Sequence, residues 1–274
     1  MKGLNGMGPH AKRWITGIVA VPLLVVLIVY GSCLLFSGVI ALLIMGGVYE
    51  YNAMVFKEKH YLEKIEGLVI ALLIPLSAYL GGAQLMFAVV TLSFIVVFLL
   101  FLMGMGSGPA DFTALIKVVF GFMYIPFLMS YIIPLRCGED GTAWIFFVIC
   151  AAFLGDISAF YVGKSIGKTK LMPSVSAGKT IEGSVGSMVG TILGCILFKL
   201  LFLHDLPLIH AVALGFLGSI IGQLGDLCES AVKRTSMVKD SGVLLPGHGG
   251  ILDRLDFFIF LIPFVYYYRI LVIR

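Results

Sequence analysis

The residues from Gln84 to Met103 read QLMFAVVTLSFIVVFLLFLM, an apolar run that contains no charged side chain. A helix needs roughly 20 apolar residues to cross the hydrocarbon layer of a bilayer. Water would not tolerate such a run on a protein surface, whereas lipid does, because a helix satisfies its own backbone hydrogen bonds. This stretch therefore predicts a transmembrane helix.

The composition extends this prediction to the whole chain. Of its 274 residues, 60% are apolar and 12% are charged, and the mean hydropathy is +1.07. A soluble domain carries about a quarter charged residues. The net charge of +4 is small and the basic residues form no array with aromatic ones, so nucleic acid is not an expected partner.

The apolar runs predict an all-α integral membrane protein, a polytopic bundle of about nine transmembrane helices. Some of these runs are short or rich in glycine, so the count is good to about one span. The first run is interpreted as an uncleaved helix, because no small-residue cleavage site follows it. The predicted spans are residues 14–30, 34–55, 66–81, 84–103, 113–133, 142–163, 184–203, 208–224 and 257–273.

Lysine and arginine favour one side of this bundle. With nine spans, the N-terminus and the segments 56–65, 164–183 and 225–256 share a side and hold most of the basic residues. The other side holds Arg136, Arg269 and Arg274. Because basic loops stay in the cytoplasm, we expect a cytoplasmic N-terminus in a bacterial-type inner or plasma membrane.

The two parts of the chain differ in chemical character. Residues 1–112 consist of apolar helices and short turns, which suit structural, dimer-forming or lipid-facing roles. In residues 113–274, charged residues enter or adjoin the spans. We therefore expect the catalytic region there, facing the cytoplasm.

The segment 223–256 has the highest density of ionisable residues in the chain. Asp226, Ser230 and Lys233 are spaced to share one helix face if the eighth span continues beyond the membrane. Asp253 and Asp256 have the same relation at the start of the last helix. Two helix ends that carry carboxylates can hold a hard cation through oxygen ligands.

A glycine-rich loop, Pro246-Gly-His-Gly-Gly250, lies between these two helix ends. Successive backbone N–H groups in such a loop can form an anion-binding concavity, and the flanking basic residues suit phosphate. The same features also occur as solvated helix caps and ordinary turns.

Two further clusters precede this segment. Asp156 lies in an apolar run, where it needs either a partner or a wet cavity, although a packing hydrogen bond would also explain it. Ser176, Lys179 and Thr180 precede the seventh span, and can bind an anion at a helix N-terminus or merely cap it. The full phosphate-binding P-loop pattern is absent.

From Ser230 to Asp256 the sequence resembles the signature of the phosphatidate cytidylyltransferases, also called CDP-diacylglycerol synthases. The signature reads S-x-apolar-K-R, then K-D, then P-x-H-G-G and finally D-R-apolar-D, and each fixed position is matched. Residues 156–163 and 176–183 are similar to two other motifs of the family. The second has Ala177 where the family usually has proline, but keeps Lys179, Thr180 and Glu182.

The resemblance implies a membrane enzyme, commonly a homodimer, that transfers CMP from CTP to phosphatidic acid among membrane lipids and releases pyrophosphate. It also implies Mg²⁺, with K⁺ as a second ion of a paired metal centre. The implied metal ligands are Asp226, Asp253 and Asp256. The other catalytic candidates are Lys233, Arg234, Lys239 and Arg254. The substrate-binding candidates are Asp156, Ser176, Lys179, Thr180, Glu182, Ser230, His248, Gly249 and Gly250.

Two alternatives differ in chemistry. A CTP-dependent lipid kinase would transfer phosphate rather than CMP. An ion-coupled membrane transporter would use Asp156 as an ion site, and predicts repeated halves with broken helices, which the sequence does not display.

Overall fold

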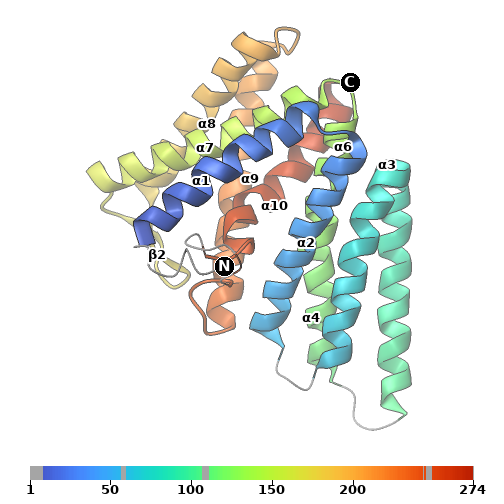
Figure 1. The fold of residues 1–274 in the computed structure, drawn as a ribbon. Coiled ribbons are helices and arrows are strands. Elements are labelled where there is room, and N and C mark those ends of the chain that lie inside the picture. The colour runs from blue at the N-terminus through green and yellow to red at the C-terminus, as the bar shows by residue number, and fades with distance from the viewer. Residues whose placement is uncertain (1–8, 57–59, 107–110, 243, 245–248, 274) are drawn as a thin grey trace. The chain divides into compact units, whose positions relative to one another are not determined.

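The computed structural model describes residues 9–56, 60–106, 111–242, 244 and 249–273. The chain forms two compact units (Figure 1). The first unit comprises residues 1–133 and 240–254, and the second comprises residues 134–239 and 255–274.

Helices make up most of the first unit, and its described residues between 240 and 251 are irregular. Its elements are α1 (Pro9–Tyr30), α2 (Cys33–Val55), α3 (Tyr61–Met105), α4 (Phe112–Phe122), the π-helical turn η1 (Met123–Phe127), α5 (Leu128–Ser130) and the start of α6 (Ile132–Cys137). The first turn of α10 also belongs to this unit.

The second unit combines long helices with one small hairpin of strands. Its elements are α7 (Gly141–Ile166), β1 (Lys170–Met172), β2 (Ser176–Thr180), α8 (Ile181–Phe202), α9 (Leu208–Thr235), most of α10 (Leu252–Tyr268) and η2 (Arg269–Ile273). The strands are antiparallel, with Lys170 opposite Thr180 and Met172 opposite Ser176. This hairpin occupies the segment that the sequence predicted as a plain loop before the seventh span.

The predicted class, an all-α polytopic membrane protein, is confirmed. Seven helices among the described residues are long and apolar enough to cross a membrane. The predicted number of nine is approximate. Helix α3 is one of the seven, although it folds back on itself and covers two of the predicted spans. In addition, the described apolar part of α1, Val21–Tyr30, is shorter than a full span.

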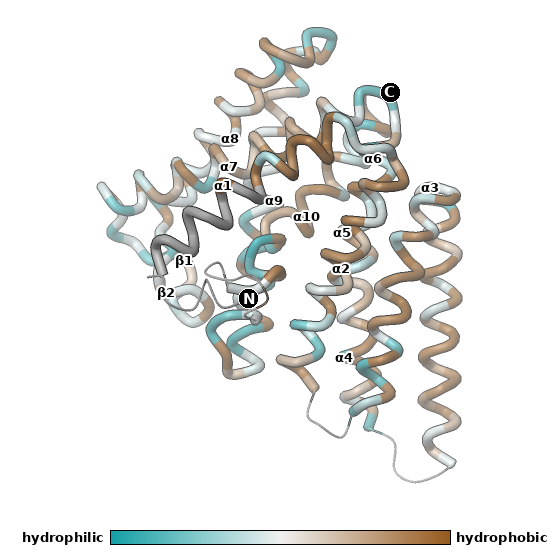
Figure 2. Tube along the Cα trace, in the orientation of Figure 1, coloured by the Kyte–Doolittle hydropathy of each residue, from teal (hydrophilic) through white to brown (hydrophobic). Residues whose placement is uncertain are grey.

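Helix α3 accounts for two of the predicted spans. Its two arms lie side by side (Figure 1), and the break falls at Gly81 and Gly82. Gly82 has φ of 60° and ψ of −155°, a conformation that a side chain makes costly. Hydrophobic residues run along most of both arms (Figure 2), and Leu72, Leu76 and Leu80 are exposed. Such a surface suits contact with lipid chains.

Hydrogen bonds hold α2 in place within the first unit. The Tyr51 hydroxyl donates to the Lys117 carbonyl at 2.9 Å, and the Lys117 ammonium donates to the Val55 carbonyl at 2.7 Å. The Asn52 amide donates to the Lys64 carbonyl at 3.1 Å. Because α3 and α4 each contribute a partner, the C-terminal end of α2 is held from two sides.

Small residues bring α7 and α8 together in the second unit. A Cβ atom at Gly155 would meet the side chains of Thr191 and Ser187, and one at Gly190 would lie 2.6 Å from the Leu154 carbonyl oxygen. The two backbones therefore approach closely, as membrane helices do where small residues face each other.

Candidate active site

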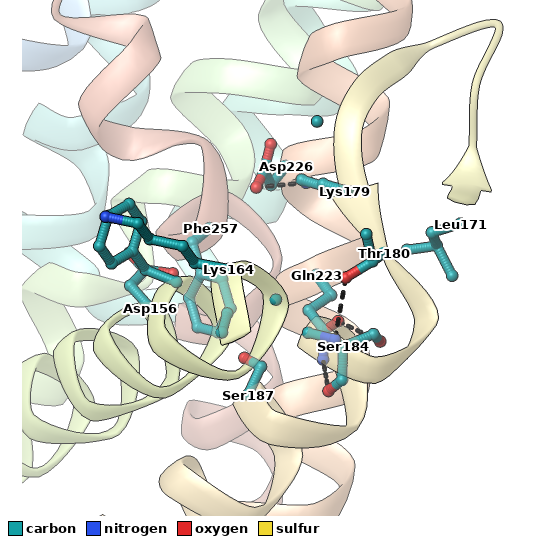
Figure 3. Close-up of a pocket in the computed structure, with 15 residues that line it drawn as sticks. Asp156, Lys164, Leu171, Lys179, Thr180, Ser184, Ser187, Gln223, Asp226 and Phe257 are labelled. Carbon is teal, nitrogen blue, oxygen red and sulfur yellow. Dashed lines mark hydrogen bonds and ion pairs between the residues drawn. The ribbon is translucent and has the colours of Figure 1, made fainter. Parts of the chain in front are cut away.

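A cavity of about 360 Å³ in the second unit brings together side chains from α7, β2, α8, α9 and α10. Figure 3 shows its lining residues, with Lys179 reaching toward Asp226 and Ser184 beside Gln223. The polar residues that line it are Asp156, Lys164, Lys179, Thr180, Ser184, Ser187, Gln223 and Asp226.

An ion pair joins Lys179 at the end of β2 to Asp226 on α9 (Figure 3). Their side chains are 27% and 29% exposed. Both side chains line the cavity, and the Lys179 Nζ itself is buried against the carboxylate. The pair is a contact that a phosphate or a metal ion can replace.

Asp256 on α10 belongs to the same electrostatic cluster. The charges of Asp226, Lys179 and Asp156 all act on its carboxylate, which also accepts a hydrogen bond from the Phe257 backbone N–H at 2.7 Å. Three carboxylates therefore gather near one ammonium group. The local charge is negative, which favours an additional cation.

Glycines on α9 allow α10 to approach Asp226. A Cβ atom at Gly225 would lie 2.6 Å from the Asp256 carbonyl oxygen, and one at Gly222 would meet the Phe257 ring. Because Gly225 directly precedes Asp226, the two helices are in close contact beside the two carboxylates. Backbone packing thus sets the relation between Asp226 and Asp256.

The start of α8 forms a second wall of the cavity. Thr180 is the N-cap residue, and its hydroxyl accepts a hydrogen bond from the Gly183 N–H at 3.1 Å. The Glu182 carboxylate accepts from the Thr169 N–H, at 3.1 and 3.2 Å to its two oxygens, and so ties the helix start to the chain before β1. The predicted cap at this helix is confirmed for Thr180, whereas Ser176 begins β2. The N-terminus of α8 adds partial positive charge to the wall.

Helix α9 continues to Thr235, as the spacing of Asp226, Ser230 and Lys233 required. Ser230 is buried, and Lys233 forms an ion pair with the fully buried Glu229 one turn earlier. The Arg234 guanidinium donates to the carbonyls of Val175 and Val238, at 3.1 and 3.0 Å. Arg234 therefore holds the turn of the β-hairpin to the end of α9.

Asp253 and the residues around it belong to the first unit. Its carboxylate accepts hydrogen bonds from the N–H groups of Ser241, at 3.1 Å, and Gly250, at 3.0 Å. Gly249 has φ of 84°, a left-handed conformation that favours glycine. Arg254 is exposed. This carboxylate orders the chain at the start of α10.

Comparison with known proteins decides the family. The chain matches the cytidylyltransferase family over residues 11–272. The chain belongs to this family. A phosphatidate cytidylyltransferase of Staphylococcus aureus (strain COL) is 32% identical over 265 residues, which cover 92% of this chain and 95% of that protein.

Two further relatives match over shorter alignments. A phosphatidate cytidylyltransferase of Bacillus subtilis (strain 168) is 41% identical over 167 residues, which cover 57% of this chain and 62% of that protein. One of Staphylococcus saprophyticus is 37% identical over 161 residues, 56% of this chain and 62% of that protein. These two alignments span less than two thirds of the relatives' length.

In this member of the family, the structure brings together only part of the predicted site. Asp156, Lys179, Thr180, Asp226 and Asp256 share one unit and one cluster. Asp253 and Arg254 lie in the other unit, Lys239 is exposed at the end of the second unit, and His248 lies outside the described residues. The roles assigned to these residues stay predictions.

Sequence reasoning missed several residues that line the cavity. The Gln223 amide donates to the Ser219 hydroxyl at 2.9 Å and accepts from the Ser184 hydroxyl, and so joins α9 to α8. A glutamine in an apolar helix needs such partners, and this was the available signal. Three other lining residues could not be identified from the sequence, because no motif or spacing marks them: Lys164, Ser187 and Phe257.

Proposed function

We propose that this chain makes CDP-diacylglycerol by transferring CMP from CTP to phosphatidic acid, with release of pyrophosphate. Its family membership makes it a nucleotidyltransferase, and relatives that match nearly its full length carry the name phosphatidate cytidylyltransferase. The observation that carries the proposal is the pairing of Lys179 with Asp226, beside Asp256, at a cavity in a membrane protein.

The reaction places the chemical demand on electrostatics. The phosphate of phosphatidic acid has a second pKa of about 6 and is largely a dianion at neutral pH. One of its oxygens attacks the α-phosphorus of CTP, and the bond between that phosphorus and the bridging oxygen of pyrophosphate breaks. Since the nucleophile is already deprotonated, the site must mainly position two anions that repel each other.

The residues of the cavity suit this task. The Lys179 ammonium and the N-terminus of α8, capped by Thr180, can bind phosphate oxygens. Lys164 adds a further cation at the end of α7. In this scheme Lys179 exchanges its contact with Asp226 for a phosphate of CTP when the substrate enters.

The remaining carboxylates suit a divalent cation. Asp226 and Asp256 supply oxygen ligands of the kind that Mg²⁺ prefers, and the acidic cluster already draws one cation, Lys179. Within the described residues, no three acidic, histidine or cysteine side chains form a ready metal site. We therefore propose that these two carboxylates, with Asp253 as a further ligand and K⁺ as a second ion, complete the site with substrate oxygens. Bound Mg²⁺ would neutralise charge on the triphosphate.

The proposed topology follows from where the substrates lie. Phosphatidic acid keeps its acyl chains in the bilayer, and CTP is a solute of the cytoplasm, so the cavity is placed at the cytoplasmic surface with the N-terminus on the same side. Helix α9 has 28 residues, more than the roughly 20 that span a bilayer, so its charged end can extend to the surface. A homodimer is proposed on the resemblance to the family.

Labelled CTP tests the reaction directly. The purified protein is incubated with phosphatidate vesicles, Mg²⁺ and CTP that carries ³²P on either the α- or the γ-phosphate. We expect the α-label in the chloroform-soluble lipid and the γ-label in pyrophosphate. A γ-label in the lipid would establish a CTP-dependent lipid kinase, and a lipid free of both labels would overturn the proposal in favour of a transporter or an inactive scaffold.

A further inference from the structure

Glu50 is a buried carboxylate that the proposed mechanism does not use. It lies on α2, in the part of the chain that carries few charged residues, and its exposed fraction is 2%. A charged or polar side chain in such a place is costly unless it has partners. The residues that it contacts therefore indicate its role.

Two hydrogen bonds connect Glu50 to a segment about 200 residues away in the sequence. One carboxylate oxygen, Oε2, accepts from the Ser241 hydroxyl at 3.1 Å and from the Leu252 backbone N–H at 3.0 Å. Leu252 is the first residue of α10. Glu50 thus holds the start of this helix, and it also holds Ser241 near the beginning of the segment 240–254.

Two glycines of this segment make room for the carboxylate. A Cβ atom at Gly242 would collide with Oε1 of Glu50. One at Gly250 would lie 2.6 Å from Oε2 and would also collide with the Ser241 hydroxyl. The segment is therefore packed directly against Glu50, with no space for a larger residue at either position.

Ser241 passes this constraint on to Asp253. Its hydroxyl oxygen accepts a hydrogen bond from the Asp253 N–H at 3.3 Å, while its own N–H donates to the Asp253 carboxylate at 3.1 Å. Gly250 donates to the same carboxylate oxygen at 3.0 Å. A shift of Ser241 or of the α10 start therefore moves the Asp253 carboxylate.

We propose that Glu50 is a positioning residue for CMP transfer, which acts through Ser241 and the start of α10 to hold the carboxylate of Asp253. This inference rests on the proposed function, in which Asp253 is a metal ligand. The unequal use of its two oxygens fits this role. Oε1 has no hydrogen-bond partner among the described residues. The carboxylate therefore acts through Oε2 alone, which fixes Ser241 and the start of α10.

The test compares four variants of the full-length protein in lipid nanodiscs. Glu50→Ala removes the acceptor, and Glu50→Gln keeps an oxygen that can accept both bonds. Ser241→Ala breaks the connection to Asp253 without changing α2. Asn52→Ala is the matched control, because Asn52 is buried on the same helix and bonds to the Lys64 carbonyl instead.

Three measurements separate positioning from folding. Hydrogen–deuterium exchange reports the protection of the Ser241, Gly250 and Leu252 amides. Binding of Mn²⁺, followed by its electron paramagnetic resonance signal, reports the metal site without turnover. Steady-state kinetics then report kcat and the KM for CTP separately.

We expect Glu50→Ala and Ser241→Ala to lose about 10- to 100-fold in Mn²⁺ affinity or kcat, as losses of residues behind metal ligands do, with faster exchange at the three amides. Glu50→Gln should stay within about threefold of the unsubstituted protein, because the amide oxygen replaces Oε2. Asn52→Ala should keep the metal affinity and the amide protection at 240–254.

The proposal is overturned if Glu50→Ala, or Ser241→Ala where Glu50→Ala does not fold, keeps metal affinity, kcat and amide protection. Equal losses in Glu50→Gln and Glu50→Ala would also overturn it, since the hydrogen bonds could not then be the cause. If the unsubstituted protein makes no CDP-diacylglycerol, the proposed function fails. The exchange and Mn²⁺ measurements would still decide the role of Glu50.

Discussion

Replacing Gly225 with alanine should move the carboxylates of Asp226 and Asp256 apart without removing either. The new Cβ atom would lie 2.6 Å from the Asp256 carbonyl oxygen, whereas ordinary contact begins at 3.4 Å. The backbones of α9 and α10 must therefore move apart by about 0.8 Å, the difference between these two distances, because neither atom belongs to a flexible side chain. Asp226 and Asp256 are the neighbouring residues, so they move with their helices.

Two effects on stability oppose each other in this variant. Overpacking costs about 1–3 kcal/mol, while alanine is favoured over glycine in a helix by about 1 kcal/mol. The net loss of stability should be small enough for the variant to fold. Misplacement of catalytic groups by about 1 Å can cost 10²-fold in rate, so we expect kcat to fall by about 10- to 100-fold.

The assay measures α-labelled CTP incorporation into lipid at saturating CTP, together with a thermal melt of the same sample. Gly218→Ala is the matched control on the same helix, because its Cβ atom would meet side chains rather than backbone, the end of Leu261 at 3.0 Å and the Phe264 ring at 3.8 Å. It should retain nearly full activity. A Gly225→Ala protein with unchanged kcat would show that the spacing of α9 and α10 does not set the active geometry.

Three other substitutions test separate parts of the account. Lys179→Met should lower kcat/KM for CTP by about 10- to 100-fold, because a hydrogen bond to a charged group is worth about 1.5–3 kcal/mol. Unchanged kinetics would exclude Lys179 from phosphate binding. Thr180→Val should destabilise the protein by about 1 kcal/mol through loss of the α8 cap, and should therefore melt at a lower temperature than Thr180→Ser. Equal melting temperatures would contradict the role of the cap. Gly190→Ala should lower the free energy of unfolding by about 1–3 kcal/mol, because the Cβ atom would meet the Leu154 carbonyl oxygen at 2.6 Å. A melting temperature equal to that of the unsubstituted protein would mean that α7 and α8 pack more loosely than the structure shows.

Most of the helices follow from the sequence because apolar runs decide where they lie. The runs 66–81 and 84–103 were predicted as two spans, and the glycines between them are where α3 folds back. Asp226, Ser230 and Lys233 were predicted to share one helix face if the eighth span continues beyond its apolar part, and α9 does continue to Thr235. In both cases the signal is local, within a few turns of one helix.

Features that depend on distant contacts could not be predicted in the same way. The strands before α8 are three and five residues long, too short for a periodic pattern to emerge. Glu50 is a single acidic residue in an apolar run, and its partners Ser241 and Leu252 lie 191 and 202 residues later. Gln223 gains its place only when α9 packs against α8. Tertiary packing, rather than propensity, decides these positions.

The central claim is that carboxylates on α9 and α10 collect cations so that two phosphorylated reactants can meet. Its most direct test is the transfer of α-labelled CMP to phosphatidate by Asp226→Asn across a range of Mg²⁺ concentrations, with a melting curve to establish folding. We predict a loss of about 100-fold in a folded protein, typical for removal of a group that stabilises transition-state charge, with a higher Mg²⁺ concentration needed for half-maximal rate. Turnover and Mg²⁺ dependence equal to those of the unsubstituted protein would contradict the claim.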